Sequence, residues 1–224
     1  MTTDITTGDT IIDLVRHGAV DGEAALYGRF DIALSPVGWR QLEQALAAIT
    51  AADTSIDAII SSPLQRCQAF AAHWAQQQGM ALDIVPALRE YDFGDWDGIP
   101  FTTLFGPPED NPDGWSELEA FAQFPAGNPP PGGERIEQVY ERVVQGWQQI
   151  TEQHGGQHVV VMCHGAVIRL ILGYLLPVDW RDGNWYSSLA IHYGSRTRIR
   201  LSPHLDVAPV VECIGWLPAG SEPC

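Results

Sequence analysis

The sequence predicts an α/β fold: a three-layer α/β/α sandwich with a mostly parallel central sheet and an inserted, aromatic-rich lid segment. Short, apolar, β-branched runs alternate along the chain with longer segments whose apolar residues repeat at helical spacing. Such alternation is typical of crossover units, in which helices join parallel strands and cover both faces of the sheet. One stretch, roughly 92–133, breaks the alternation and predicts the insertion.

The predicted sheet begins with TIIDLV at 10–15, a short β-branched run bounded by polar residues. A helix should follow from Pro36 to about Thr50, because Ser35 offers an N-cap and proline suits the first helical position. Its apolar residues repeat at the spacing of a helix that packs one face against a sheet: Leu42, Ala45, Leu46 and Ile49.

The same alternation continues up to the insertion. DAIISS at 57–62 predicts a second strand, and the segment 63–79 predicts a helix that ends at Gly79. ALDIVPAL at 81–88 predicts a short third strand.

Residues 92–133 are predicted to form a folded lid over the active site. Flexible linkers rarely carry so many aromatic side chains. The Pro-rich tract PAGNPPPGGE closes the segment. The aromatic residues that support this interpretation are Trp96, Phe101, Phe105, Trp115, Phe121 and Phe124.

The C-terminal part returns to alternating elements. A helix is expected from about Glu134 to Gln153, then the strand HVVVMCHG at 158–165, then a buried helix at 166–176. Three further short strands are predicted: LAIHYG, TRIRLS and VVECIGW, at 189–194, 197–202 and 210–216.

Composition limits the class of protein and its partners. A length of 224 residues suits a single domain over 1–224, and 45% hydrophobic with 18% charged residues is typical of a globular chain. The formal net charge is −16, from 28 acidic and 12 basic residues. Nucleic acids and anionic membranes are bound by clustered Lys and Arg, so we expect neither as a partner.

The cysteines and the apolar segments indicate a cytoplasmic protein. No C-x-x-C pair is present, so the four cysteines are predicted to be reduced and mostly buried. The first residues, MTTDITTGDT, lack the basic and apolar regions of a signal peptide. The most apolar run, AVIRLILGYLLPV, is interrupted by Arg169 and Pro177 and is too short to span a bilayer.

Two predicted strands end in histidine and glycine, in the sequences VRHG and MCHG. The strand predicted at 57–62, whose end lies in the sequence IISSP, leads into a helix with Arg66 in its first turn. Ligands of open α/β sheets bind beyond the carboxyl ends of the strands. We therefore expect Arg16, His17, Arg66 and His164 to meet there, with the dipole of the helix after Pro63, around an anion. Arginine matches phosphate by planar, bidentate hydrogen bonds, so phosphate is the predicted guest.

Each of these residues alone would be ordinary. A lone histidine in a strand is more often structural than catalytic, Arg66 alone would be a solvated helix residue, and Glu90 alone would be a surface charge. Their joint occurrence at strand ends, in the order Arg-His-Gly, Ser-Ser-Pro-x-x-Arg, Leu-x-Glu, His-Gly, is much more specific.

Four segments together resemble the histidine phosphatase superfamily, which contains phosphoglycerate mutases and many phosphatases: LVRHG, SSPLQRCQAF, LREYDFGDWDG and VVVMCHGAVIR. The resemblance spans roughly Thr10 to Leu176. Within the superfamily, LYGRFDIALSPVGWRQ, FGDWDGIPF, PPPGGE and WRDGNWYSSLAI are similar to the α-ribazole phosphatases of cobalamin biosynthesis. The resemblance implies hydrolysis of α-ribazole 5′-phosphate, with a broad-specificity phosphatase or a phosphoglycerate mutase as the alternatives.

The resemblance also implies roles for the site residues. His17 would attack phosphorus and form a phosphohistidine, while Glu90 would protonate the leaving alkoxide and then deprotonate the attacking water. The residues implied to hold the phosphate oxygens are Arg16, Arg66 and His164.

Several further expectations follow from the resemblance. Tyr27 and Gly28 would line the substrate pocket, no metal or other cofactor would be required, and the partner would be a small phosphorylated molecule. A homodimer is left open. Many relatives carry a small hydroxyl residue after Arg-His-Gly, but this chain has Ala19, which weakens the case for mutase activity.

Two other classes of function stay open. The chain could be an inactive binding module that keeps the anion pocket. It could also be a metal-dependent hydrolase with His17 and His164 as ligands. Joint chelation by the adjacent Cys163 and His164 is disfavoured, because neighbouring residues of a strand point to opposite faces.

Overall fold

The computed structural model describes residues 8–52, 55–107, 110, 112–204 and 206–220. Six strands form one sheet in the order β3-β2-β4-β1-β5-β6. The pairs β3–β2, β2–β4 and β4–β1 are parallel, and β1–β5 and β5–β6 are antiparallel. The mostly parallel sheet is therefore confirmed. The strands are β1 (Thr10–Arg16), β2 (Ala58–Ser61), β3 (Leu82–Ile84), β4 (His158–Cys163), β5 (Arg196–Leu201) and β6 (Val210–Trp216).

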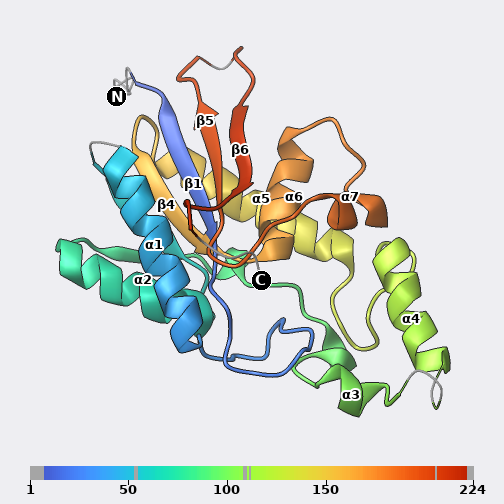
Figure 1. Cartoon of the computed structure of the whole chain (residues 1–224). Coiled ribbons are helices and arrows are strands. Elements are labelled where there is room, and N and C mark those ends of the chain that lie inside the picture. Colours follow the sequence, from blue (N-terminus) through green and yellow to red (C-terminus); the bar gives the residue numbers. More distant parts are fainter. Residues whose placement is uncertain (1–7, 53–54, 108–109, 111, 205, 221–224) are drawn as a thin grey trace.

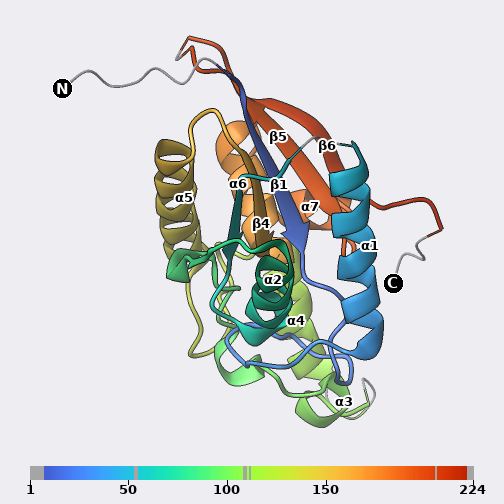
Figure 2. The same cartoon turned by 90° about the vertical axis from the view of Figure 1, so that its left-hand side faces the viewer.

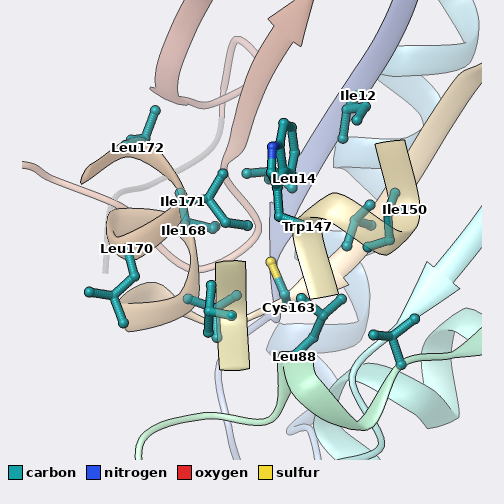
Figure 3. Close-up of a cluster of buried hydrophobic side chains, with 14 of the residues drawn as sticks. Ile12, Leu14, Leu88, Trp147, Ile150, Cys163, Ile168, Leu170, Ile171 and Leu172 are labelled. Carbon is teal, nitrogen blue, oxygen red and sulfur yellow. The ribbon is translucent and has the colours of Figure 1, made fainter. Parts of the chain in front are cut away.

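Helices cover both faces of the sheet, which confirms the three-layer arrangement (Figures 1 and 2). Helices α1 (Pro36–Ala52) and α2 (Gln65–Gln78) lie on one face, and α5 (Ile136–Gln153) and α6 (Gly165–Leu175) on the other. Alternate residues of β4 face opposite layers. Val160 and Met162 pack with α1 and α2, while Val159, Val161 and Cys163 belong to the core under α5 and α6, part of which is drawn in Figure 3.

The aromatic segment 92–133 packs beyond the carboxyl ends of β1 and β4 (Figures 1 and 2). It contains a 3₁₀ turn at Gly94–Trp96 and the helices α3 (Phe101–Leu104) and α4 (Pro112–Gln123). Most of its rings form one packed cluster, in which Trp96 and Phe121 have centroids 5.9 Å apart and Phe105 and Trp115 5.1 Å apart, while Phe124 is exposed. The segment is therefore folded, and its action as a lid stays a prediction.

The prediction of a strand at 189–194 is wrong. This segment is a loop that follows the short helix α7 (Gly183–Ser188), which the sequence did not predict. Its carbonyl groups are taken by arginine side chains, because Leu189 O accepts from Arg169 Nη2 (2.6 Å) and Ile191 O from Arg16 Nη1 (2.5 Å). The third strand is also shorter than expected, since Pro86 begins a 3₁₀ turn at Pro86–Leu88.

The cysteines agree with the predicted environment as far as the structure describes them. Cys67 and Cys163 are free and buried, Cys213 is free and half-buried, and Cys224 lies outside the described residues. Among the helices built from described residues, none combines the length and the apolarity that crossing a bilayer requires.

A buried ion-pair cluster ties β1 to β4 and β5. Asp13 is completely buried and accepts hydrogen bonds from Arg198 Nε (2.8 Å) and Nη2 (2.6 Å), and its Oδ2 lies 2.9 Å from His158 Nε2. Burial raises the pKa of this carboxyl, but the hydrogen bonds from Arg198 and His158 outweigh it and leave the pKa below its ordinary value of 3.8.

We predict that Asp13→Asn lowers the free energy of unfolding by about 3 kcal/mol, because it leaves buried cations uncompensated. The matched control is Asp9→Asn, which removes the exposed ion pair with Arg200 and should lower the free energy of unfolding far less, because solvent screens an exposed pair. Since the pKa of Asp13 is lowered in the folded state, its stabilisation is present above pH 3.8 and is lost as pH falls through the folded-state pKa. Urea unfolding of both variants and of the unmodified protein at pH 7 and at pH 3 measures the free energy of unfolding. Equal losses of this free energy in Asp13→Asn and Asp9→Asn at pH 7 would contradict the prediction.

Candidate active site

The carboxyl ends of β1 and β4 bring two histidines together. His17 N donates to Cys163 O (2.9 Å), so the chain leaves both strands side by side. The rings of His17 and His164 have centroids 5.2 Å apart, inclined at 61°. Both side chains are buried, His17 with 5% of its surface exposed. Residues that are 147 positions apart in the chain thus share one site, as the two His-Gly sequences predicted.

His17 is held as an uncharged ring, and the structure records a hydrogen bond at Nδ1 but none at Nε2 among the described residues. Its Nδ1 lies 2.8 Å from Gly18 O, and because a carbonyl oxygen only accepts, Nδ1 carries the proton. Burial, together with the guanidinium groups of Arg66 and Arg16, holds the pKa of His17 well below its ordinary value. At neutral pH the Nε2 lone pair is therefore free to act as a nucleophile.

Arg16 is held through one terminal nitrogen, and its Nε has no partner among the described residues. Its Nη1 donates to Ile191 O (2.5 Å), and its guanidinium carbon lies 4.0 Å from the ring centroid of Tyr193. Its Nε is buried and has no hydrogen-bond partner among the described residues. A Cβ added to Gly165 would lie 3.5 Å from this nitrogen, so Nε sits against the beginning of α6.

Arg66 is fully buried and anchors a loop. Its Nη1 donates to Phe30 O (3.0 Å), and its Nη2 donates to Tyr27 O (2.8 Å) and Gly28 O (2.7 Å). We expected Arg66 to hold the phosphate oxygens by bidentate hydrogen bonds, but only its Nε is left without a partner in the part of the chain that the structure describes. An unpaired buried donor on a cation is costly unless a ligand satisfies it.

The loop that Arg66 anchors is fixed from its other side by Asp97, in the FGDWDG sequence. The carboxylate accepts from the backbone N–H groups of Gly28 (3.0 Å), Arg29 (2.8 Å) and Phe30 (3.0 Å). Gly28 is buried, and an added Cβ would lie 1.9 Å from Tyr91 O, so glycine is required for packing.

The predicted contact of Tyr27 and Gly28 with substrate stays a prediction. The Tyr27 hydroxyl donates to Glu23 O (2.7 Å), and its ring is half-buried. Gly28 has no side chain, and its carbonyl oxygen accepts a hydrogen bond from Arg66 Nη2.

His164 is held by a polar group just after β2 and by one on α2. Its Nε2 lies 2.7 Å from Ser62 Oγ, which also accepts from Leu64 N (3.3 Å), and Cys67 Sγ lies 3.6 Å from the same nitrogen. Burial, Arg66, His17 and Arg16 lower the pKa of His164 well below its ordinary value. It is therefore an uncharged hydrogen-bonding group beside the ring of His17.

Glu90 lies at the N-terminus of α6 with 9% of its surface exposed. Its Oε1 accepts from Tyr91 N (3.1 Å), and its Oε2 faces Ala166 N at 3.4 Å. Arg142 Nη2 donates to the Glu90 carbonyl (2.9 Å) and also pairs with Glu134 (2.7 Å), the last residue of the Pro-rich tract. The carboxylate is thus positioned by α5 and α6 together.

The predicted contribution of the α2 dipole needs correction. The first backbone N–H of this helix, on Gln65, donates to Asp31 Oδ1 (2.7 Å), so a carboxylate already occupies that end. The helix that begins at the site is instead α6, for which His164 is the N-cap.

Tyr193 belongs to the site, and the sequence analysis missed it. Its ring lies 5.3 Å from the ring of His17 and beneath the guanidinium of Arg16. The HYG sequence could have drawn attention to it, but the strand predicted for 189–194 hid it. Arg142 and Ser62 were also given no role, although Ser62 lies in the quoted Ser-Ser-Pro sequence.

An apolar cavity of about 320 Å³ adjoins Glu90 through its neighbours Tyr91 and Ala166. None of its lining residues in the described part of the chain is charged. Its hydroxyl groups are used internally: Tyr91 donates to Glu134 O, Tyr186 to Trp180 O, and Ser187 to Gly183 O. The other lining residues are Leu26, Phe93, Phe121, Ala122, Pro125, Ile136 and Gly183. The cavity therefore suits an uncharged, apolar part of a ligand.

The described residues contain no group of three or more His, Cys, Asp or Glu arranged to hold a metal ion. The unpaired donors at the site are those of arginine, which bind anions. The predicted independence from metal stays a prediction.

Comparison with known proteins agrees with this geometry. The chain is 33% identical over 199 residues to the bifunctional protein Rv2228c of Mycobacterium tuberculosis, covering 87% of this chain but only 47% of that relative, so it spans about half the relative's length. It is 32% identical over 168 residues to a metal-independent phosphoserine phosphatase of Arabidopsis thaliana, covering 72% of this chain and 67% of the relative.

The fold is similar to the crystal structure of the α-ribazole phosphatase from Shigella flexneri, with a TM-score of 0.74, 21% identity, and coverage of 95% of this chain and 99% of that one. A family model described as Histidine phosphatase superfamily (branch 1) matches residues 12–207. With both histidines, both arginines and the glutamate at one edge of the sheet, the chain belongs to the histidine phosphatase superfamily.

Proposed function

We propose that this protein hydrolyses a phosphomonoester through a phosphohistidine at His17, and that the substrate is α-ribazole 5′-phosphate. The observation that carries the proposal is an uncharged His17, with its Nε2 free, beside two arginines whose buried Nε–H groups are unpaired among the described residues. Such a site supplies a nucleophile together with cationic donors for a phosphoryl group.

The first step forms a bond from His17 Nε2 to phosphorus and breaks the phosphorus–oxygen ester bond. Glu90, in its protonated form, gives its proton to the departing alkoxide. In the second step Glu90 takes a proton from water, whose oxygen attacks phosphorus as the phosphorus–nitrogen bond breaks. Inorganic phosphate leaves and His17 is again neutral. Arg16, Arg66 and His164 stabilise the phosphoryl oxygens in both steps.

The apolar cavity supports the choice of substrate. The leaving group must lie next to Glu90, and the cavity that adjoins Glu90 has aromatic walls without charge. The benzimidazole-like base of α-ribazole can pack there. The charged groups of phosphoserine or phosphoglycerate would find no counter-charge among its lining residues.

The test compares α-ribazole 5′-phosphate with ribose 5-phosphate, which has the same phosphorylated sugar but no base. We expect kcat/KM to be at least about tenfold higher for α-ribazole 5′-phosphate, because its base buries apolar surface. Equal rates would overturn this substrate while leaving the phosphatase chemistry intact. Formation of 2-phosphoglycerate from 3-phosphoglycerate would point to the mutase alternative.

A matched pair of variants tests the cavity itself. Phe121→Ala removes part of the wall and should lower kcat/KM for α-ribazole 5′-phosphate about tenfold, with ribose 5-phosphate changed less than about twofold. Phe124→Ala removes a ring just outside α4 that is 52% exposed and does not line the cavity, so both substrates should be unaffected. Equal losses on both substrates in Phe121→Ala would contradict this use of the cavity.

A further inference from the structure

We infer that Tyr193 is a positioning residue of this site: its ring orients the Arg16 guanidinium so that the unpaired Nε–H faces the phosphoryl group. The inference rests on the proposed function, because it assigns Arg16 to the phosphoryl oxygens. Tyr193 lies in the loop at residues 189–195, which follows α7.

The loop encloses Arg16 on several sides. Arg16 N donates to Ser195 O (3.0 Å), and Arg16 Nη1 donates to Ile191 O (2.5 Å). Gly194 N donates in turn to the carbonyls of Arg16 (3.1 Å) and His17 (3.2 Å). The backbone of the loop therefore fixes both the main chain and one end of the side chain of Arg16.

The loop itself is anchored by residues other than Arg16. Arg169 Nη2 donates to Leu189 O (2.6 Å), and Arg169 Nη1 donates to Gly165 O (3.1 Å) at the start of α6. Gly194 adopts a φ of +69° and packs against Gln41, where an added Cβ would lie 2.9 Å from Cβ of that residue. The loop therefore holds a defined conformation next to the phosphate site.

The hydrogen bond to Ile191 O constrains only one end of the guanidinium plane. Rotation about that end would carry Nε away from the site. The Tyr193 ring removes this freedom, because its centroid lies 4.0 Å from the guanidinium carbon in a cation–π contact. The centroid of the same ring lies 5.3 Å from that of His17, so Tyr193 contacts both His17 and Arg16.

The ring, rather than the hydroxyl, is the part of Tyr193 that this role requires. Tyr193→Phe should therefore keep both kcat and phosphate affinity within about twofold of the unmodified protein. Tyr193→Leu keeps apolar bulk but loses the aromatic face. We expect it to weaken binding of inorganic phosphate about tenfold and to lower kcat for p-nitrophenyl phosphate by a similar factor.

Phosphate affinity is measured by calorimetric titration, which needs no turnover, and kcat by release of p-nitrophenol. Thermal melting of each Tyr193 variant shows whether a loss of affinity or kcat comes from unfolding rather than from a misplaced Arg16 side chain. The matched control is Trp216→Leu, which removes the ring under Arg196 (4.6 Å), a cation–π pair outside the site, and should change neither quantity.

Two results would overturn the inference. One is Tyr193→Leu with phosphate affinity and kcat within about twofold of the unmodified protein. The other is Tyr193→Phe losing as much as Tyr193→Leu, which would assign the effect to the hydroxyl. An unmodified protein that binds phosphate but never hydrolyses an ester would refute the proposed function instead, and the phosphate titrations would still test Tyr193.

Discussion

Replacement of His17 by alanine is expected to lower kcat for phosphomonoester hydrolysis by at least about 10⁴-fold, because the covalent step loses its nucleophile. The site offers no substitute: the other imidazole, His164, has its Nε2 engaged with Ser62 Oγ. KM should change much less, since the arginine donors stay in place. Steady-state kinetics with p-nitrophenyl phosphate measures both quantities.

His73→Ala is the matched control, because this histidine is exposed on α2 and contacts Gln77 and Trp39 rather than the site. It should retain full activity. A His17→Ala variant that keeps more than about one tenth of the activity would mean that another group attacks phosphorus.

Replacement of Glu90 by glutamine is expected to lower kcat by about 10²- to 10⁴-fold for an alkyl phosphate, because the alkoxide must leave without a proton. The rate of the first step should fall much less for p-nitrophenyl phosphate, because its phenolate leaves without needing a proton. Deprotonation of the water that hydrolyses the phosphoenzyme also needs Glu90, so this variant should accumulate phosphoenzyme from p-nitrophenyl phosphate. Rapid-mixing kinetics would show a burst of p-nitrophenol followed by slow turnover.

Glu152→Gln, at an exposed position of α5, serves as the control and should show no burst beyond that of the unmodified protein. A Glu90→Gln loss that is the same for alkyl and aryl phosphates, without a burst, would assign Glu90 a structural role through its contacts with Tyr91 N and Ala166 N.

The part of the fold that follows from local periodicity was predictable. The strand HVVVMCHG is buried along its whole length and lies in the middle of the sheet, so its apolar residues are needed on both faces. Its neighbour TIIDLV is buried except at Ile11, and one of its buried residues is the ion-paired Asp13. Because parallel strands end at one edge, the histidines that follow them had to lie together, and this much of the site was accessible from the sequence.

The C-terminal loop was not predictable from pattern alone. LAIHYG has the β-branched and aromatic composition of a strand, but the carbonyls of Leu189 and Ile191 bind Arg169 and Arg16 instead of a neighbouring strand. Those arginines are distant in the sequence, and nothing local signals them. Tyr193 was missed for this reason.

The hydrogen-bond partners of Arg66 also could not be predicted from the sequence. Its three hydrogen bonds go to backbone carbonyls of a loop at Tyr27–Phe30, and a carbonyl acceptor is not encoded by any particular side chain. Only the fold shows that its two terminal nitrogens are used for structure and that Nε alone is left for an anion.

The central claim is that His17 becomes covalently phosphorylated, and trapping the intermediate tests it most directly. The protein, and Glu90→Gln to prolong the intermediate, would be mixed with a phosphoryl-labelled aryl phosphate, quenched in base and digested for mass spectrometry. We predict a base-stable, acid-labile phosphate on the peptide that contains His17, absent from His17→Ala. Rapid turnover with no phosphate on His17 at any quench time, or label that survives in His17→Ala, would contradict the account.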